Sequence, residues 1–378
     1  MLWKILRVMV IAAQGVVSAV FVASLIRTHV LVAQWVALII AGLTMLLGLV
    51  GVLLFRRSAV PKIVGLVSLV AVCVGAVFAM RYTESLNAFL DQVSVSEPAL
   101  QVEQESTPEA PSKITDKPFL LYISGIDSRN GYQEQGLSDV NLLLAVNPKQ
   151  SRILLASVPR DTYVQLHGTT GLRDKLTHAG AYGLEMSRAT LEDFLGVKID
   201  YTMKVSFETV TRVVDELHGV EIYSDKALTL GVEGNPNKQC YYYAGTQTVD
   251  GDCALAFSRE RKSYATGDKH RGENQQEVLS AIIAKLTGSR ENLLRVPEIL
   301  GILAGSFTTS FTRDNITDFL QYQLSVGPEW QVETANVDGV GDMLPTYTMG
   351  PDDPRWVMLA FEDSVAEVSA KIKEYLQE

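Results

Sequence analysis

The sequence predicts an α/β protein: a layered α/β/α domain with a central mixed sheet, preceded by three transmembrane helices. Three observations predict it. Long apolar stretches fill most of residues 1–80, a polar stretch rich in Ser, Glu, Gln and Pro follows, and strand-like runs alternate with helix-like runs from residue 118 onward. We therefore divide the chain into a three-span region (1–80), a linker (81–117) and a folded domain (118–378).

The first 80 residues predict membrane helices and their orientation. Apolar residues run almost without interruption over Val8–Ile26, Val30–Phe55 and Ile63–Met80. Each stretch is long enough to cross a ~30 Å hydrocarbon core as a helix that rises ~1.5 Å per residue. Cations, which stay on the cytoplasmic side, precede the first stretch and separate the second from the third: Lys4, Arg7, Arg56, Arg57 and Lys62. We expect a multi-pass protein of the cell membrane with a cytoplasmic amino terminus and an extracellular linker and domain.

The charge balance excludes one class of function. The chain has 33 Lys and Arg against 43 Asp and Glu, for a net charge of −10. Binding nucleic acid through a diffuse basic surface needs many Lys and Arg contacts to phosphate. We therefore expect no nucleic-acid partner, and a polyanion would have to bind at a local basic site.

The cysteines show no metal-ligand spacing and no Cys-x-x-Cys motif. Cys240 and Cys253 fall on the side that we assign to the outside of the cell, where a disulfide persists once formed. Two unrelated thiols are the alternative.

The elements of the domain follow from apolar runs and their punctuation. Continuous apolar runs predict strands covered on both faces, at Phe119–Ile126, Val140–Val146 and Ile153–Val158. Further strands are expected at Ile199–Phe207 and Val220–Tyr223. Helical patterns, two of them closed by Gly196 and Gly219, cover Lys175–Tyr182, Leu184–Leu195, Glu208–Leu217, Glu277–Leu286, Leu293–Leu303, Ile316–Leu324 and Asp363–Leu376.

A charge-dense stretch, Arg259–Gln275, lies between two helix-like segments. Arginine presents a planar fork of donors that suits the oxygens of phosphates and diphosphates. A solvated loop held by salt bridges is the alternative. Arg259 and Arg261 are two residues apart, so in an extended conformation they would project to one side.

Acidic and basic residues also gather at predicted strand ends. Asp127 follows the first strand, Asp139 precedes the second, and Arg160 and Asp161 end the third. Open α/β sheets build their sites at such ends, so a hairpin-like return would bring the two aspartates together. Magnesium binds through one or two carboxylates beside a diphosphate. The alternative is that Asp127 forms a turn and Asp139 a cap.

These motifs resemble the LytR-CpsA-Psr family of bacterial envelope assembly. The similarity runs from about Phe119 to Leu286 through Gly125-Ile126-Asp127, Ser138-Asp139, Pro159-Arg160-Asp161, Asp174 to Gly180, Phe257 to Arg261, Gly267-Asp268, Arg271-Gly272 and Asn274-Gln275-Gln276. The three-span amino terminus is similar to that of capsule-type members typified by CpsA. Glu273 stands where relatives often have a basic residue, and the linker is too short for the accessory domain of some capsule-type relatives.

The resemblance implies a phosphotransferase that moves a glycopolymer, such as capsular polysaccharide or a teichoic-acid-like polymer, from a polyprenyl diphosphate carrier to peptidoglycan. It places Mg²⁺, or Mn²⁺ in its stead, on Asp127 and Asp139. Its diphosphate-binding residues fall on Arg160, Arg259, Arg261, Arg271 and Gln275, with Lys175 beside them. Membrane lipid and other capsule-assembly proteins are further expected partners.

The sequence leaves the general base and the exact activity open. Asp161 and Asp268 are the candidate catalytic carboxylates beside Arg160, Arg259 and Arg261, and orienting an arginine is the favoured role for each. A polyprenyl diphosphate sensor that regulates capsule synthesis, and a hydrolase that uses water as acceptor, are the alternatives. The sensor would need the arginines but has less need of a metal.

Overall fold

The computed structural model describes residues 113–127, 136–264, 267–303 and 306–377, together with Val74, Val77 and Arg81. The three apolar stretches and most of the linker therefore lie outside the described residues. Within the described part, no helix combines the length and apolarity needed to span a bilayer. The chain forms two compact units, Met1–Asp91 and Gln92–Glu378, and the second holds the elements described below.

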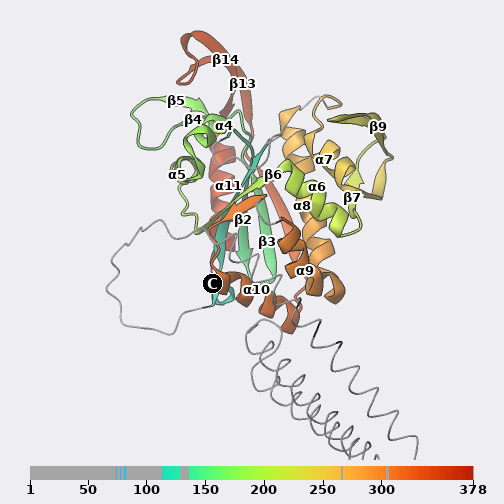
Figure 1. Ribbon diagram of the computed structural model, residues 1–378. Coiled ribbons are helices and arrows are strands. Elements are labelled where there is room, and N and C mark those ends of the chain that lie inside the picture. The colour runs from blue at the N-terminus through green and yellow to red at the C-terminus, as the bar shows by residue number, and fades with distance from the viewer. Residues whose placement is uncertain are drawn as a thin grey trace, which may run out of the picture. The chain divides into compact units, whose positions relative to one another are not determined.

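A six-stranded mixed sheet forms the centre of the domain (Figure 1). Its strands, in spatial order, are β11 (Phe307–Thr309), β6 (Tyr201–Ser206), β1 (Phe119–Ile126), β2 (Ser138–Asn147), β3 (Arg152–Ser157) and β12 (Gln331–Asn336). β1 is parallel to β6, β3 is parallel to β12, and β2 runs antiparallel between β1 and β3. Four strands therefore point the same way, so their carboxyl ends share one edge with the start of β2.

Helices cover both faces of this sheet, which confirms the predicted α/β class with a mixed central sheet. One face packs on α4 (Leu176–Ala179), α5 (Leu184–Leu195) and α11 (Glu362–Tyr375), with the 3-10 turn η2 (Gly180–Tyr182) between α4 and α5. The other packs on the 3-10 turn η1 (Ile114–Asp116), α8 (Asp268–Thr287) and α10 (Arg313–Ser325). Because both faces are buried, the strands read as continuous apolar runs.

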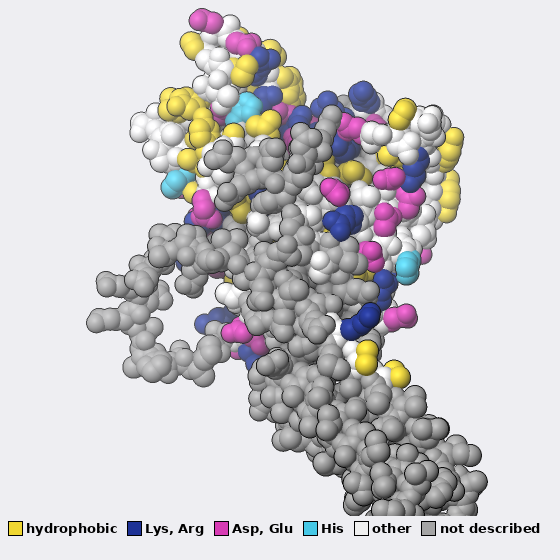
Figure 2. Space-filling view, viewed as in Figure 1, with side chains coloured by type: hydrophobic (Ala, Val, Ile, Leu, Met, Phe, Trp, Pro, Cys, Tyr) yellow, Lys and Arg dark blue, Asp and Glu magenta, His cyan; other side chains and the backbone are white. Residues whose placement is uncertain are grey.

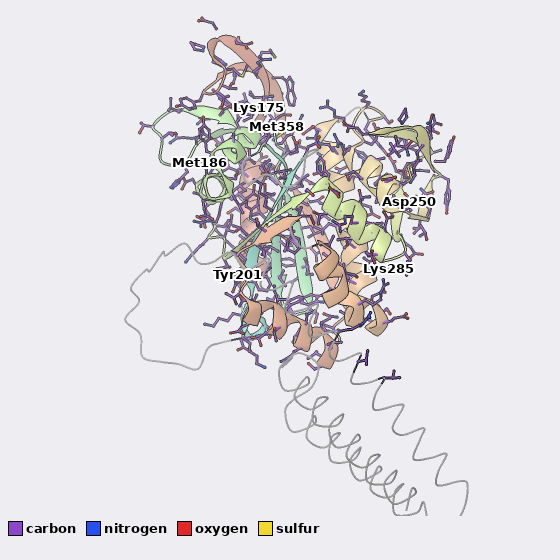
Figure 3. The ribbon with its side chains drawn as sticks, viewed as in Figure 1. Lys175, Met186, Tyr201, Asp250, Lys285 and Met358 are labelled. Atoms are coloured by element: carbon purple, nitrogen blue, oxygen red, sulfur yellow. A yellow bond between two sulfur atoms is a disulfide. The ribbon has the colours of Figure 1, made fainter. Side chains whose placement is uncertain are left out.

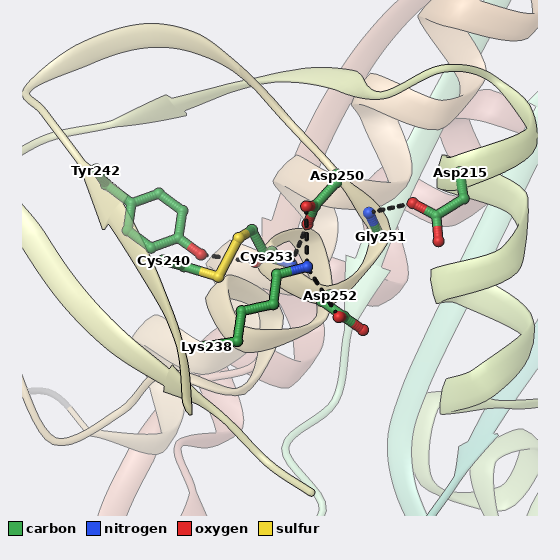
Figure 4. The surroundings of a disulfide bond; sticks show 8 residues. All are labelled: Asp215, Lys238, Cys240, Tyr242, Asp250, Gly251, Asp252 and Cys253. Atoms are coloured by element: carbon green, nitrogen blue, oxygen red, sulfur yellow. Dashed lines mark hydrogen bonds and ion pairs between the residues drawn. A yellow bond between two sulfur atoms is a disulfide. The ribbon is translucent and has the colours of Figure 1, made fainter. Parts of the chain in front are cut away.

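A lobe beside the sheet carries the arginine-bearing helix. It contains α6 (Phe207–Glu216), α7 (Gly251–Arg259), α9 (Arg290–Leu303) and two small sheets, β7 (Val220–Ser224) with β10 (Gly245–Val249) and β8 (Leu228–Val232) with β9 (Asn235–Tyr242). A disulfide between Cys240 and Cys253 joins β9 to the first turn of α7 (Figure 4). Of the two cysteine alternatives, the structure contains the bonded one.

Two further hairpins flank the opposite side of the sheet edge. β4 (Tyr163–Gln165) pairs with β5 (Arg173–Lys175), and β13 (Gly339–Thr346) pairs with β14 (Gly350–Ala360). The β13–β14 hairpin projects beyond the rest of the domain at the top of Figure 1. The sequence reading anticipated neither hairpin.

The strand predicted at residues 220–223 is present as β7, which pairs with β10 in a small sheet. One predicted boundary was wrong, because the helix expected from Glu277 begins earlier. The charge-dense stretch is not a loop throughout, because Arg259 ends α7 and α8 already begins at Asp268. The first turns of α8 show no apolar periodicity in the sequence, because their buried residues are the polar Asn274 and Gln276. Gln276 donates to backbone carbonyls of both β3 and β12.

Candidate functional site

The carboxyl edge of the central sheet positions the candidate site. Asp127 follows β1, Asp139 lies at the start of β2, and Arg160 follows β3. α6 begins at Phe207, directly after β6. The chain reverses between β1 and β2, and the antiparallel register pairs Gly125 with Val140. The two aspartates are therefore brought to one place by the strand pairing that their spacing predicted.

Two adjoining hollows occupy this edge. The larger has a volume of about 190 Å³ and is lined by Asp127, Asp139, Arg160, Phe207, Arg259, Arg261, Arg271 and Gln275. The smaller shares four of these residues, Asp139, Arg160, Arg271 and Gln275, and adds Asp268 and Lys269. In Figure 2, Lys and Arg side chains gather between the projecting hairpin and the side lobe. The structure thus brings together the six predicted arginines and aspartates in one cavity wall.

Arg160 is held between two carboxylates. Its Nη1 donates to Asp139 Oδ1 at 2.5 Å, and its Nε lies 3.6 Å from Asp161 Oδ2. Burial, the largest single influence, lowers the pKa of Arg160, but the hydrogen bond to Asp139 and its charge, with that of Asp161, outweigh burial and raise it. The guanidinium is therefore fully charged at any physiological pH.

Lys175 and Asp161 lie behind the cavity wall. Lys175 Nζ lies 2.8 Å from Asp161 Oδ1, and neither residue lines either hollow. The side chains are 17% and 9% exposed, so the pair is largely shielded from solvent. With one carboxylate oxygen on Lys175 and the other facing Arg160, Asp161 orients the arginine rather than meeting a ligand.

Asp268 and Arg271 form a second shielded ion pair, on the first turn of α8. Arg271 Nη2 donates to Asp268 Oδ2 at 2.8 Å; it lies equally close to Oδ1, but in a direction that makes no hydrogen bond. Arg261 Nη1 approaches the same Oδ1 at 3.9 Å. Burial raises the pKa of Asp268, and the opposing charge of Arg271 does not cancel the shift. Burial also lowers the pKa of Arg271.

Arg259 closes the opposite side of the cavity from the end of α7. Its Nη2 lies 3.3 Å from Asp127 Oδ2 and 2.7 Å from Glu233 Oε2. Its guanidinium carbon lies 4.9 Å from the centre of the Phe207 ring, within the range of a cation–π contact. A cation in the last turn also suits the negative end of the helix. Sequence reasoning missed Glu233 and Phe207, because no spacing links them to Arg259.

Tyr264 fastens the turn that carries Arg261. Its hydroxyl donates to Asp225 Oδ1 at 2.6 Å, and Lys226 Nζ lies 3.6 Å from the centre of its ring. Lys226 Nζ also donates to the carbonyl of Ser263 at 2.5 Å. These contacts tie a turn with an exposed arginine to the side lobe. They were not predicted, since the residues are nearly forty positions apart.

A buried polar network supports Asp139 from below. Tyr122 Oη donates to Asn141 Oδ1 at 2.7 Å, as does Ser138 Oγ, and Ser138 also contacts Ser124. Burial raises the pKa of Tyr122, so its hydroxyl stays protonated and a donor. Such fully paired networks hold one geometry. Asn141, Ser157, Lys269 and Asn336, which also line the smaller hollow, were not singled out from the sequence.

The carboxylates of the cavity suit a divalent cation only when a bound diphosphate supplies further ligands. Among the described residues, no group of three or more His, Cys, Asp or Glu side chains is arranged to hold a metal. Asp127 and Asp139 supply two carboxylates on one cavity, each contacting an arginine through one oxygen. Magnesium keeps several waters and binds through one or two carboxylates plus substrate phosphates. The residues therefore fit a magnesium ion bound jointly with a diphosphate.

The family of the chain follows from a match to a family model. The LytR_cpsA_psr family model matches residues 86–359. The chain belongs to the LytR-CpsA-Psr family. The resemblance carried by the sequence motifs is thereby confirmed.

Relatives in this family have assigned activities. A Bacillus mycoides (strain KBAB4) protein named polyisoprenyl-teichoic acid–peptidoglycan teichoic acid transferase TagU is 32% identical over 246 residues, 65% of this chain and 76% of its own. The Bacillus subtilis (strain 168) TagU is 29% identical over 261 residues, 69% of this chain and 78% of its own.

Solved structures of the family share the fold. Bacillus subtilis TagV matches with a TM-score of 0.57 and 25% identity, over 69% of this chain and 97% of TagV. A structure of TagT bound to LIIa-WTA matches with a TM-score of 0.56 and 26% identity, over 75% of this chain and 99% of TagT. The domain therefore shares its fold with solved members of the family.

Proposed function

We propose that this protein is a membrane-anchored phosphotransferase that transfers a glycopolymer from a polyprenyl diphosphate carrier to peptidoglycan. The observation that carries the proposal is the single cavity whose wall combines four arginines with two aspartates at the carboxyl edge of the sheet. The family membership and the names of the TagU relatives support the same reaction class. One fold can carry unrelated activities, and the activity depends on the residues at the site.

The arginines would bind the diphosphate of the carrier. Arg160 and Arg271 present charged donors from one side of the cavity, and Arg259 presents its own from α7. Fixed donors of this kind need no rearrangement when charge develops on the transferred phosphoryl group. They would therefore neutralise both the bound diphosphate and the charge that accumulates on the leaving polyprenyl phosphate.

The reaction is a displacement at phosphorus. A sugar hydroxyl of peptidoglycan forms a bond to the phosphorus next to the polymer, and the bond from that phosphorus to the bridging oxygen breaks. Polyprenyl phosphate leaves with the bridging oxygen, and the hydroxyl proton passes to a base. Asp268 is the better placed of the two candidate bases, because it lines the smaller hollow, whereas Asp161 lines neither hollow.

Asp127 and Asp139 would hold magnesium, with manganese as the alternative. The ion would supply charge neutralisation to the diphosphate oxygens. The role of the two carboxylates is then to fix its position on the cavity wall, beside arginines that already contact them. Chelation is expected to abolish transfer and added Mg²⁺ to restore it.

The apolar face under α8 and α10 is the proposed seat of the carrier's lipid tail. It combines a buried cluster with partly buried apolar side chains packed against it, among them Ile123, Met203, Leu279, Ile283 and Phe319. We place the catalytic domain outside the cell, on a multi-pass anchor with a cytoplasmic amino terminus. That side of the membrane is where peptidoglycan and lipid-linked polymer meet.

The polymer is proposed as a teichoic-acid-like or capsular glycan. The relatives' names favour the first, and the resemblance of the three apolar stretches to those of capsule-type members favours the second. The test is which polymer is lost from the wall of cells that lack the protein.

The decisive experiment measures transfer by the full-length protein. Arg259→Ala and Asp139→Asn are each expected to lower the transfer of a lipid-linked glycan to peptidoglycan by roughly 100-fold or more, as for loss of one charge-stabilising group. Arg188→Ala is the matched control. Its side chain is 26% exposed, against 31% for Arg259, and it also contacts two carboxylates, but on α5.

Three outcomes separate the possible functions. Retained transfer in both site variants would refute the assignment. Release of polyprenyl phosphate at the same rate with and without peptidoglycan would indicate a hydrolase. Tight diphosphate binding with no turnover in either assay would indicate a sensor.

A further inference from the structure

The β13–β14 hairpin exposes a group of large apolar side chains. Met343, Tyr347, Met349 and Trp356 are each at least 40% exposed. Contiguous exposed apolar surface on a soluble domain marks an interaction site more often than single residues do. The hairpin stands out from the domain, and acidic side chains lie beside the apolar ones at its tip (Figures 1 and 2).

The hairpin is tied to the loop that carries Arg160. At its base, the Met358 amide donates to the carbonyl of Asp161 at 2.8 Å, and Thr162 forms a bridge with Met358. Figure 3 places Met358 beside Lys175, whose ammonium also contacts Asp161. The strand that leads into the hairpin, β12, ends at Asn336, which lines the smaller hollow. The base of the hairpin is therefore tied to the loop that carries Arg160 and to the strand that ends at the smaller hollow.

The turn of the hairpin is tied as well. The amide and hydroxyl of Thr348 both donate to Asp174 Oδ2, at 2.8 Å and 2.5 Å. Tyr163 Oη donates to the carbonyl of Pro345 at 2.8 Å. Asp174 is fully buried, and hydrogen bonds from His178 and Thr348 outweigh its burial and lower its pKa, so the anchor is charged at neutral pH. The hairpin is thus fixed at both ends.

The indole of Trp356 is both exposed and fixed by packing on this hairpin. It lies opposite Met343 in the antiparallel register, so the two side chains share a face. A Cβ added at Gly341 would lie 2.6 Å from Nε1 of the indole and 2.9 Å from two of its ring carbons. The indole therefore packs against the bare backbone of Gly341 while Trp356 remains 46% exposed. A ring fixed before binding loses little conformational entropy when a ligand covers it.

We propose that this face of the β13–β14 hairpin binds the glycan strand of the peptidoglycan acceptor. An indole covers the apolar C–H face of a pyranose ring, and neighbouring carboxylates accept hydrogen bonds from sugar hydroxyls. The hairpin supplies both, because Asp352 and Asp353 are exposed beyond Trp356 on β14, and Arg355, the only cation of the hairpin, forms an ion pair with Asp353. The inference rests on the proposed transfer to peptidoglycan.

The negative charge of the hairpin distinguishes between the ligands that could bind to it. Loops that enter membrane surfaces carry Lys and Arg around their apolar residues, and anionic lipids repel carboxylates. An anionic teichoic-acid-like donor would be repelled in the same way. The acetylated amino-sugar backbone of peptidoglycan is uncharged along its rings, so it is the glycan that this acidic, aromatic surface accepts.

The test measures binding of the full-length protein, in detergent, to sacculi stripped of attached polymers. Trp356→Ala is expected to weaken co-sedimentation roughly tenfold or more, as for an aromatic anchor at the centre of an interface. Gly341→Ala should weaken it too, because the indole must move. Trp356→Phe should restore part of the affinity. Tyr241→Ala, which removes a 72% exposed tyrosine from β9, is the matched control and should bind as wild type.

Kinetics and the outcomes complete the test. In the transfer assay, Trp356→Ala should raise the KM for peptidoglycan and leave kcat unchanged. The proposal would be overturned if Trp356→Ala bound sacculi with wild-type affinity, or if Trp356→Ala and Tyr241→Ala lost the same affinity. It would also be overturned if Trp356→Ala changed the oligomeric state and left sacculus binding unchanged. Arg259→Ala should still bind sacculi. Trp356-dependent binding by a wild-type protein that transfers nothing would refute the proposed function and leave the glycan-binding inference standing.

Discussion

Breaking the disulfide between Cys240 and Cys253 tests how the arginine-bearing helix is held. The bond links residues 13 apart and fastens β9 to the first turn of α7, whose last residue is Arg259. In the chain-entropy account, closing a loop of this length stabilises the folded state by about 3 kcal/mol at 25 °C. We expect the Cys240→Ser, Cys253→Ser double variant to lose about that much stability.

Noncovalent contacts around the bond limit the effect on geometry. Lys238 Nζ reaches both Asp250 and Asp252 at the start of α7, at 3.0 Å and 2.9 Å, and Tyr242 Oη donates to the carbonyl of Cys253 at 2.7 Å (Figure 4). The Asp250 side chain also caps the helix through the Cys253 amide. Below the unfolding transition, α7 should therefore stay in place and transfer should be retained.

The assay is thermal unfolding of the full-length protein in detergent, with and without reductant. For a domain of about this size, a loss of about 3 kcal/mol lowers Tm by roughly 6–12 °C. Cys73→Ser is the control, because it removes the third cysteine and should leave Tm and its sensitivity to reductant unchanged. An unchanged Tm in the double variant, or a reductant effect that persists in it, would refute the reasoning.

Two further predictions concern the site and its support. Burial raises the pKa of Asp268, so this carboxylate is protonated at a higher pH than an ordinary one. Both of its candidate roles, general base and partner of an arginine, need the charged form. The transfer rate should therefore fall, as pH is lowered, at a pH above the usual carboxyl range, and the residual rate of Asp268→Asn should not show this fall. The same shift makes the charged form costly to the fold, so its contribution to stability should fall as pH rises through the folded pKa. Gly251→Ala brings a Cβ into collision with the carbonyl oxygen of Thr211, so we expect the free energy of unfolding to fall by about 1–3 kcal/mol, measured by chemical denaturation. Gly231→Ala is the control and should lose much less, because a Cβ there would meet no atom within 4 Å apart from its chain neighbours.

The sheet was predictable from sequence because its burial is uniform. β1, β2 and β3 are covered on both faces, so their apolar runs are unbroken and their ends are sharp. Sharp ends also located Asp127, Asp139 and Arg160, since each lies where an apolar run stops or starts. The pairing of β1 with β2 then placed the two aspartates on one cavity, as the spacing indicated.

Elements defined by long-range contacts were not predictable in this way. β12 and the β13–β14 hairpin have mostly exposed or half-exposed residues, so neither alternation nor an apolar run marks them. The start of α8 could not be predicted because the buried Gln276 donates from its side-chain amide to two strand carbonyls, a role that depends on β3 and β12 being in place. Glu233 and Tyr264 likewise act through partners that the chain brings near only on folding.

The ion pairs of the site explain how such a dense cationic cluster can fold before a ligand binds. Arg160 contacts Asp139, Arg259 contacts Asp127, and Arg271 contacts Asp268, so the arginines are neutralised within the protein. A diphosphate that takes over Arg160 and Arg259 releases the same two carboxylates that are proposed to hold magnesium. A released carboxylate beside a diphosphate is unfavourable unless a cation joins it. Anion and cation are therefore expected to bind with positive coupling, which favours the complete donor complex over either component alone.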